Sequence, residues 1–476
     1  MRYSHLITTL ILLMGFPFML SAANRLSEDN EQYSYASNPR HVQVRLYLRD
    51  KTGTPYTLSN PEKYLSPKAI ERRRRQNLTI DSTDLPLPPV YLQQIRDAGA
   101  HIDAVSKWNN TVLVRLQDTT LLQRIMELPF IMKGKKVWTE PDSVLLPPKN
   151  RKSLISNSYR YKEDKYYGEA QTQINMLEGT FLHDAGFKGR GMTIAVIDAG
   201  YFNVDRIKAL QSARILGTKD FVDSHSDIYA ENEHGTKVFS CLAANEPYAM
   251  VGTAPEASYW LLRSEDSRSE SLAEEDYWAA AAEFADSVGV DIINTSVGYY
   301  RYDDPTQNFK YKDLDGRTMM ISRTAALASS KGLIICCSAG NTGTESWKKI
   351  TIPADADHIL TIGSVDRSRT VSLFSAVGNT ADNRIKPDIV GLGSWCAILG
   401  INGNVTHGSG TSFSSPIICG LIACLWQAFP HYTALEMMDI IRKCSDNAST
   451  PDNVYGYGIP DFRKAYLYLK SLNQSR

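Results

Sequence analysis

Three short segments of this 476-residue chain carry side chains that could perform acid–base or nucleophilic chemistry. Asp198 ends an apolar run, His234 stands before a Gly-Thr pair at the expected start of a helix, and Ser412 precedes a long apolar stretch. A serine at the amino end of a helix lies beside backbone N–H groups that have no partner within the helix, and such groups can bind an oxyanion. These residue types therefore permit nucleophilic catalysis at Ser412.

Each of the three residues, taken alone, also has an ordinary structural explanation. An Asp after an apolar strand often caps a turn or a helix, and it can also bind Mg²⁺ or a ribose. A lone His before a glycine favours a structural role, and Ser412 could be a helix cap. Considered singly, the residues leave these alternatives open.

The elements expected around these residues form an α/β fold. Helices are expected at residues 271–287 and 318–331. Apolar runs typical of buried strands occur at residues 192–197, 259–263, 291–295, 332–337 and 359–365. Apolar strands that alternate with helices predict a doubly wound parallel sheet, in which functional groups lie at the carboxyl ends of the strands. Asp198 follows the first of these strands.

The preceding part of the chain has a different pattern. Strands are expected at residues 42–48, 101–105, 111–116 and 131–138, with helices near residues 92–98 and 118–128. The resulting order β-α-β-β-α-β is typical of a small ferredoxin-like α+β module. Four consecutive arginines at residues 72–75 predict a solvent-exposed patch or, alternatively, a protease processing site. Residues 147–167 are polar, lack periodicity and indicate a linker.

The first 23 residues have the pattern of a secretory signal peptide. Arg2 precedes an uncharged apolar run that ends at Ser21-Ala22-Ala23. We therefore expect a secreted or periplasmic product without a membrane span after signal removal, and an uncleaved anchor is the alternative. Lys plus Arg and Asp plus Glu both number 52, so the composition favours no nucleic-acid partner.

The cysteine content gives no disulfide pattern. There are 7 cysteines, an odd number, and several of them stand in apolar runs where burial as small hydrophobic residues is the simpler interpretation. We predict no disulfide connectivity.

In the order Asp, His, Ser, the three residues resemble the catalytic triad of the subtilisin-like serine proteases, the subtilases of peptidase family S8. The resemblance covers about residues 168–467. Its motifs are Ile197-Asp198-x-Gly200, His234-Gly235-Thr236-x-Val238, Gly410-Thr411-Ser412-x-x-Ser415-Pro416, Ser338-Ala339-Gly340-Asn341 and Asn294-Thr295-Ser296-Val297-Gly298.

The resemblance implies a serine endopeptidase that works through an acyl-enzyme. Asp198 would orient His234, His234 would accept the Ser412 proton, and the Asn341 amide would stabilise the oxyanion. Substrate would be bound by residues of the two remaining motifs, namely Ser296, Gly298, Ser338 and Gly340. A catalytically inactive, peptide-binding member of the same fold is the alternative.

The resemblance also assigns roles to the parts of the chain. Residues 24–160 would form a propeptide that acts as an intramolecular inhibitor, and residues 161–476 would form the peptidase domain. A retained accessory domain is the alternative for the N-terminal module. An α/β-hydrolase esterase and a dinucleotide-binding enzyme are disfavoured, because the Gly-x-Ser-x-Gly and Gly-x-Gly-x-x-Gly motifs are absent where those folds need them.

The sequence motifs define the cofactors and the substrate specificity less closely than the catalytic residues. The chemistry requires no cofactor, and any metal site is unknown. Many subtilases bind structural calcium, but residues 245–250 do not reproduce a calcium loop of the family. We expect protein or peptide substrates with a broad apolar or aromatic preference, because no acidic cluster is evident near the predicted pocket. Asp355 and Glu345 leave a basic preference open.

Overall fold

The computed structural model describes residues 34–36, 41–118, 120–141, 144–146 and 155–474. The predicted signal peptide and residues 147–154 of the predicted linker lie outside these ranges. Strands β1 (Ser34–Ala36) and β6 (Val144–Leu146) pair antiparallel and belong to one compact unit. A second unit comprises residues 39–141 and 153–476, and it contains every other element.

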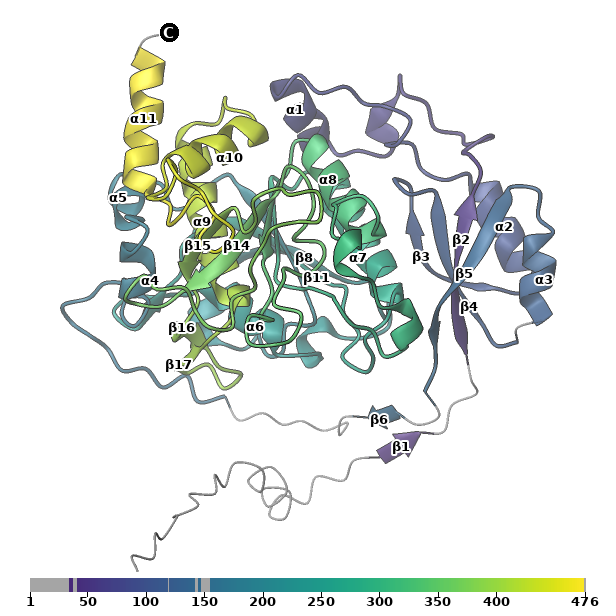
Figure 1. Cartoon of the computed structure of the whole chain (residues 1–476), viewed down its shortest axis with the longest axis horizontal. Helices are drawn as coiled ribbons and strands as arrows, with labels where there is room; N and C mark the ends of the chain where they lie inside the picture. The colour runs from purple at the N-terminus through teal and green to yellow at the C-terminus, as the bar shows by residue number, and fades with distance from the viewer. Residues whose placement is uncertain (1–33, 37–40, 119, 142–143, 147–154, 475–476) are drawn as a thin grey trace, which may run out of the picture. The chain divides into compact units, whose positions relative to one another are not determined.

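A parallel sheet of seven strands forms the centre of this second unit (Figure 1), and its strand order is β15-β14-β13-β12-β7-β11-β8. The strands are β7 (Thr193–Asp198), β8 (Arg214–Asp220), β11 (Ser258–Arg263), β12 (Ile292–Thr295), β13 (Ile334–Ser338), β14 (Leu360–Val365) and β15 (Ile389–Leu392). All residues of β7, β12, β13 and β14 are buried, as a sheet covered on both faces requires. The predicted doubly wound fold is confirmed.

Side chains that alternate along the strands build a separate core on each face of the sheet. Ile194 and Val196 pack in one core with α6 (His234–Ala243) and α9 (Thr411–Ala428). Ala195 and Ile197 pack in the other core with α7 (Ala273–Ser287) and α8 (Met320–Ser330). This alternation follows from the two-residue period of a strand.

Shorter elements complete the second unit. After residue 155 the remaining helices are α4 (Gln171–Asn175), α5 (Thr180–Asp184), α10 (Ala434–Lys443) and α11 (Phe462–Gln474). Two hairpins are formed by β9 (Asn245–Glu246) with β10 (Met250–Val251), and by β16 (Cys396–Leu399) with β17 (Val405–Gly408). Single 3₁₀ turns occur at η1 (Pro61–Lys63), η2 (Lys208–Leu210), η3 (Ile228–Ala230), η4 (Pro305–Gln307) and η5 (Tyr311–Asp313).

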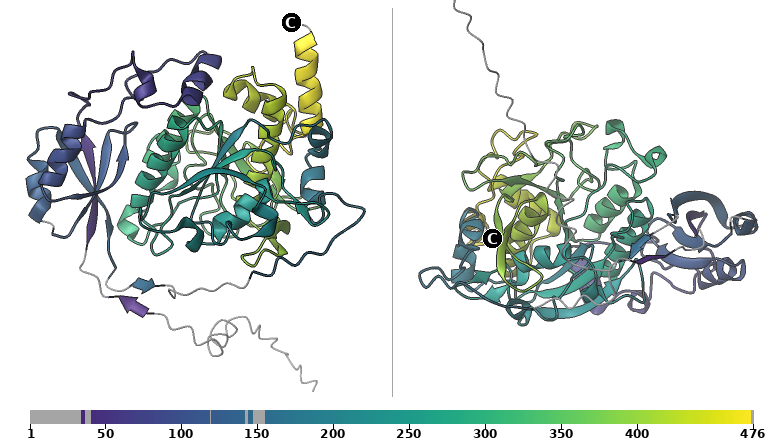
Figure 2. Two further views of the ribbon diagram at one scale, coloured as in Figure 1. Left: turned by 180° about the vertical axis from the view of Figure 1, so that it is seen from behind. Right: turned by 90° about the horizontal axis from the view of Figure 1, so that it is seen from below.

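An antiparallel sheet of four strands, in the order β3-β4-β2-β5, forms the N-terminal domain. Its elements are β2 (Val42–Leu48), α2 (Pro89–Asp97), β3 (His101–Ser106), β4 (Thr111–Leu116), α3 (Thr120–Met126) and β5 (Ile131–Thr139). Helices α2 and α3 cover one face, and the other face lies against α7 (Figures 1 and 2). Element order and strand order confirm the ferredoxin-like prediction.

The prediction of a solvent-exposed arginine patch is wrong for two of its four residues. Helix α1 (Pro67–Arg75) carries all four arginines, and Arg72 and Arg73 are 2% and 1% exposed. Arg72 pairs with Asp286 at the end of α7, and Arg73 bonds both Asp286 (2.8 Å) and Asp84 (2.7 Å). Burial among these carboxylates also makes the Arg72-Arg73 bond a poor processing site in the folded chain.

The most apolar helix of the described residues belongs to the core. Among those residues, α9 alone is long and apolar enough to cross a membrane, and 89% of it is buried inside the fold. The 7 cysteines are likewise all buried, and none of them forms a disulfide. Their predicted role as small core residues is confirmed.

Candidate active site

The carboxylate at the end of β7 bonds the imidazole at the start of α6. Asp198 is fully buried, and its Oδ1 accepts hydrogen bonds from His234 Nδ1 (2.7 Å) and from the Ala199 N–H (2.8 Å). A Cβ at Gly235 would lie 2.3 Å from the Gly200 carbonyl, so only glycine allows the helix to approach this closely. The motif glycines therefore set the distance between the two elements.

This pairing also sets the protonation chemistry of His234. Burial lowers the pKa of His234, but the charge of Asp198 and its hydrogen bond raise that pKa by more, so it lies above its usual 6.5. Because Nδ1 donates to Asp198, Nε2 is the nitrogen that can accept a proton. His234 is thus arranged as a base with one defined acceptor.

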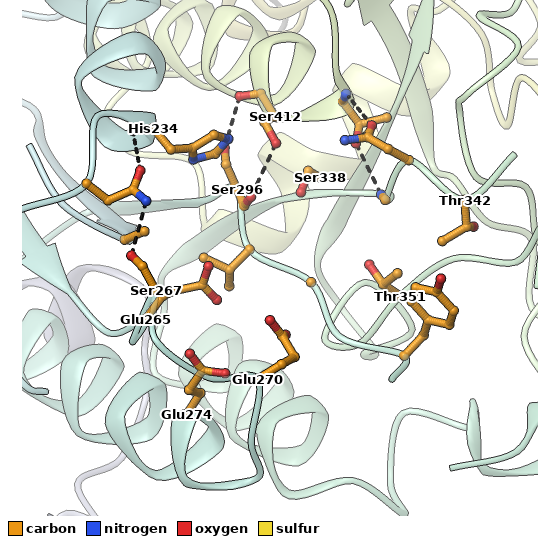
Figure 3. Close-up of a pocket in the computed structure, with 18 of the residues that line it drawn as sticks. His234, Glu265, Ser267, Glu270, Glu274, Ser296, Ser338, Thr342, Thr351 and Ser412 are labelled. Atoms are coloured by element: carbon orange, nitrogen blue, oxygen red, sulfur yellow. Dashed lines mark hydrogen bonds between the residues drawn. The ribbon is translucent and has the colours of Figure 1, made fainter. Parts of the chain in front are cut away.

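A proline inside α9 allows Ser412 to be held in the cleft that His234 also lines. Pro416 lacks an N–H, so the Ser412 carbonyl four residues earlier has no helical partner and accepts from Ser296 Oγ at 3.0 Å. The Ser412 hydroxyl donates to the Ser296 carbonyl at 3.3 Å. His234 and Ser412 line one cleft (Figure 3), and no hydrogen bond between them is present in the described residues.

Two donors next to Ser412 could hold an oxyanion. Asn341 Oδ1 accepts from the Thr411 N–H (2.9 Å) and from Thr411 Oγ1 (3.0 Å), which leaves Nδ2 as a donor toward the cleft. The Ser412 N–H, one residue further along the helix start, has no acceptor in the described part of the chain. This arrangement fits the expected oxyanion role of Asn341.

The four predicted substrate-binding residues also meet in this cleft. Ser296 and Gly298 follow β12, and Ser338 and Gly340 lie at the end of the neighbouring strand β13. All four line a cavity of about 520 Å³ together with His234 and Ser412. The parallel sheet brings them together because the carboxyl ends of adjacent strands share one edge.

One wall of the cleft is acidic, which the sequence analysis missed. Glu265, Glu270 and Glu274 line the cavity on one side and are named here the carboxylate wall (Figure 3). Burial raises the pKa of Glu265 to about 7, and loss of hydration raises that of Glu270 to about 8. The prediction that no acidic cluster lies near the pocket is wrong, because the chain after β11 returns along the cleft into α7.

Glu345 and Asp355, the two carboxylates that left a basic preference open in the sequence analysis, lie in different places. Glu345 lines the cleft, whereas Asp355 is buried and accepts hydrogen bonds from Ser322 Oγ (2.5 Å) and the Gly316 N–H (2.8 Å). Signals for the wall were available in the sequence, since Glu270 and Glu274 are four residues apart at the start of an expected helix.

The described residues contain no group of three or more His, Cys, Asp or Glu side chains that could hold a metal ion. Residues 245–250 form the β9–β10 hairpin and its turn. Structural calcium stays an untested expectation.

Comparison with known proteins gives consistent matches along both parts of the chain. Residues 189–458 match the subtilase family, and residues 43–152 match the peptidase S8 propeptide domain of Bacteroidota. Serine protease AprX of Bacillus subtilis (strain 168) is 26% identical over an alignment of 338 positions, and the match covers 64% of this chain and 73% of AprX. Subtilisin E of the same strain is 26% identical over 306 positions, and that match covers 63% of this chain and 70% of subtilisin E.

Among solved structures, the MycP3 protease from the type VII (ESX-3) secretion system aligns with a TM-score of 0.49 and 20% identity. The alignment covers 65% of this chain and 91% of that protein. On the strength of the family match, this chain belongs to the subtilase family of serine endopeptidases and carries an N-terminal propeptide domain ahead of its peptidase domain.

Proposed function

We propose that Asp198, His234 and Ser412 form the catalytic triad of an active, exported endopeptidase. The observation that carries this proposal is the 2.7 Å bond between Asp198 Oδ1 and His234 Nδ1, which faces a cleft shared with Ser412. A carboxylate, an imidazole and a hydroxyl in this relation are the parts that serine hydrolysis of a peptide needs.

The reaction uses the groups already described. When a peptide binds, Ser412 Oγ leaves the Ser296 carbonyl, passes its proton to His234 Nε2 and attacks the substrate carbonyl carbon. The Asn341 amide and the Ser412 N–H stabilise the oxyanion, while Asp198 stabilises the imidazolium. His234 then protonates the leaving amine, and water, deprotonated by the same nitrogen, releases the acyl group. Side chains and the Ser412 N–H supply every step, so the proposal requires no cofactor.

The N-terminal domain is proposed to inhibit the peptidase until it is removed. Trp138 Nε1, near the end of β5, donates to Ser269 Oγ at 2.9 Å, and Ser269 adjoins Glu270 of the carboxylate wall. The chain therefore leaves the propeptide sheet beside the loop that lines the cleft. Together with the predicted signal peptide, the position of the propeptide domain beside the cleft supports a secreted or periplasmic zymogen. Its mature chain would begin between residues 150 and 168.

A catalytically inactive peptide-binding protein is the competing function. It is favoured by one observation, that the Ser412 hydroxyl bonds Ser296 and not His234. Catalytic hydrogen bonds are often long or poorly aligned until substrate binds, so this contact is also compatible with the enzyme function.

Labelling with a fluorophosphonate probe separates the two functions. The exported protein, with Ser412→Ala and His234→Ala variants, would be treated with the probe, and the adduct located by peptide mass. Ser267→Ala is the matched control, because Ser267 lines the same cleft without an imidazole partner. Labelling at Ser412 that both triad variants lose and Ser267→Ala keeps would support the enzyme. An unlabelled, folded protein would support the binding function. The N-terminus of the same sample reports propeptide removal.

A further inference from the structure

The cleft contains a slot that receives the side chain of the residue whose carbonyl is attacked. Its two walls are the backbone runs at residues 296–298 and 338–340, which follow the adjacent strands β12 and β13. Ser412 is bonded to the first wall through Ser296, and Asn341 directly follows the second. When Asn341 and the Ser412 N–H hold the oxygen of the attacked carbonyl, the side chain of the residue that contributes this carbonyl therefore points between these two walls.

Thr351 occupies the space between the two walls. A Cβ added at Gly298 would lie 2.2 Å from Thr351 Oγ1, and one added at Gly340 would lie 2.8 Å from the same atom. The Thr351 side chain thus touches both glycines and closes the slot. Gly340 also has φ +105°, a backbone conformation that favours glycine.

The backbone that carries Thr351 is fixed to both walls. The Thr351 N–H donates to the Ala339 carbonyl (3.1 Å) on one side. On the other side, Ile352 and Tyr299 exchange two hydrogen bonds, each of 3.0 Å. Thr351 is 3% exposed, and these backbone hydrogen bonds hold it between the two walls.

The Thr351 hydroxyl is an unused hydrogen-bonding group at the closed end of the slot. Its Oγ1 is buried and has no hydrogen-bond partner among the described residues, and the residue lines the cleft (Figure 3). Buried hydroxyls in folded proteins nearly always have a partner, which indicates that a bound group completes this one.

We propose that Thr351 is a specificity-determining residue that restricts cleavage to peptide bonds after small residues, with serine preferred over alanine. The proposal rests on the proposed endopeptidase function. A serine side chain is short enough for the slot and offers a hydroxyl to Thr351 Oγ1, whereas leucine or phenylalanine would need the volume that Thr351 fills. This replaces the broad apolar or aromatic preference expected from the sequence.

The test compares quenched fluorescent peptides that differ only in the residue before the scissile bond, which is Ala, Ser, Leu or Phe. Cleavage positions are confirmed by mass spectrometry. We expect kcat/KM for Ala and Ser to exceed that for Phe at least about tenfold, the usual scale of discrimination by pocket volume. Thr351→Gly should raise kcat/KM for Phe about tenfold or more, because it opens the slot.

Two further variants separate size from hydroxyl recognition. Thr351→Val keeps the side-chain volume, so it should still reject Phe but lose the preference for Ser over Ala. Thr344→Gly, on the exposed part of the same loop, should leave the profile unchanged. Fluorophosphonate labelling of each variant verifies that its active site is folded.

The outcomes are distinguishable. A wild-type protein that labels at Ser412 and cleaves after Phe as fast as after Ala overturns the role of Thr351 while the proposed function stands. A Thr351→Gly variant that labels normally with an unchanged profile also overturns it. A wild-type protein that neither labels nor cleaves overturns the proposed function and this inference with it.

Discussion

Replacement of Asp286 by alanine should destabilise the unprocessed chain strongly, because this carboxylate joins the propeptide domain to the peptidase domain. Asp286 is fully buried on α7 and pairs with both Arg72 and Arg73 of α1. Without it, Arg73 keeps Asp84 at 2.7 Å, but Arg72 keeps only backbone carbonyls, those of Val290 and Lys331 among them. One buried guanidinium then has no direct ion-pair partner among the described residues.

The magnitude follows from that single unpaired charge. Removing one partner of a buried ion pair costs about 3–5 kcal/mol of the free energy of unfolding. Urea unfolding would be followed by tryptophan fluorescence in a Ser412→Ala background, which prevents self-cleavage, with hydrogen exchange of the α1 amides as a local probe. Glu71→Ala is the matched control, because it breaks a pair with Arg74 on the exposed side of the same helix.

The test compares the unfolding midpoints of the Asp286→Ala and Glu71→Ala variants. Glu71→Ala should leave the unfolding midpoint nearly unchanged, since exposed ion pairs contribute little. If Asp286→Ala changes stability no more than Glu71→Ala, the arginines are solvated and the buried network is refuted.

The pH dependence of this effect has a defined sign. Burial raises the pKa of Asp286, but Arg72, Arg73 and Lys107 lower it by more, so it lies below its usual 3.8. A depressed carboxyl pKa contributes stability above the unfolded pKa, and that stability is lost as pH falls through the folded value. The difference between parent and Asp286→Ala should therefore shrink below about pH 4.

Three further predictions concern the cleft. Asn341→Ala should lower kcat by about 10² to 10³, the loss known for the corresponding donor in subtilisin, with normal circular dichroism; an unchanged kcat would remove Asn341 from the oxyanion site. Because the pKa of His234 lies above 6.5, kcat/KM on a neutral substrate should rise with pH to a half-maximum above that value; a flat profile from about pH 5 to 9 would contradict its role as base. For peptides that keep a small residue directly before the scissile bond, the ratio of kcat/KM with Lys to kcat/KM with Ala at an earlier position should increase between about pH 7 and 8, as Glu265 and Glu270 ionise, and the increase should be smaller in Glu270→Gln; a ratio independent of pH would show that the carboxylate wall does not contact the substrate.

The fold class and the positions of the site residues could be predicted from the sequence because their signals are local. The apolar runs before Asp198 and Asn341 identify strands, and a parallel sheet places the ends of such strands on one edge. Strand β8 was not predicted, since this edge strand alternates between exposed and half-buried residues and contains Arg, Thr, Lys and Asp. Strand β15 was missed because it has only 4 residues, one of them glycine.

The amino-acid sequence by itself thus determined five of the seven strands of the parallel sheet, the ferredoxin-like domain and the residues that meet around Ser412, since each depends on a periodicity or motif within a few neighbouring residues. The tertiary structure decided the burial of Arg72 and Arg73 and the closure of the slot by Thr351. Arg72 and Asp286 are 214 residues apart, and Thr351 contacts a glycine on each of two separate strand ends. Charge pairing and pocket shape of this kind arise from contacts between distant parts of the chain, and local sequence carries no signal for them.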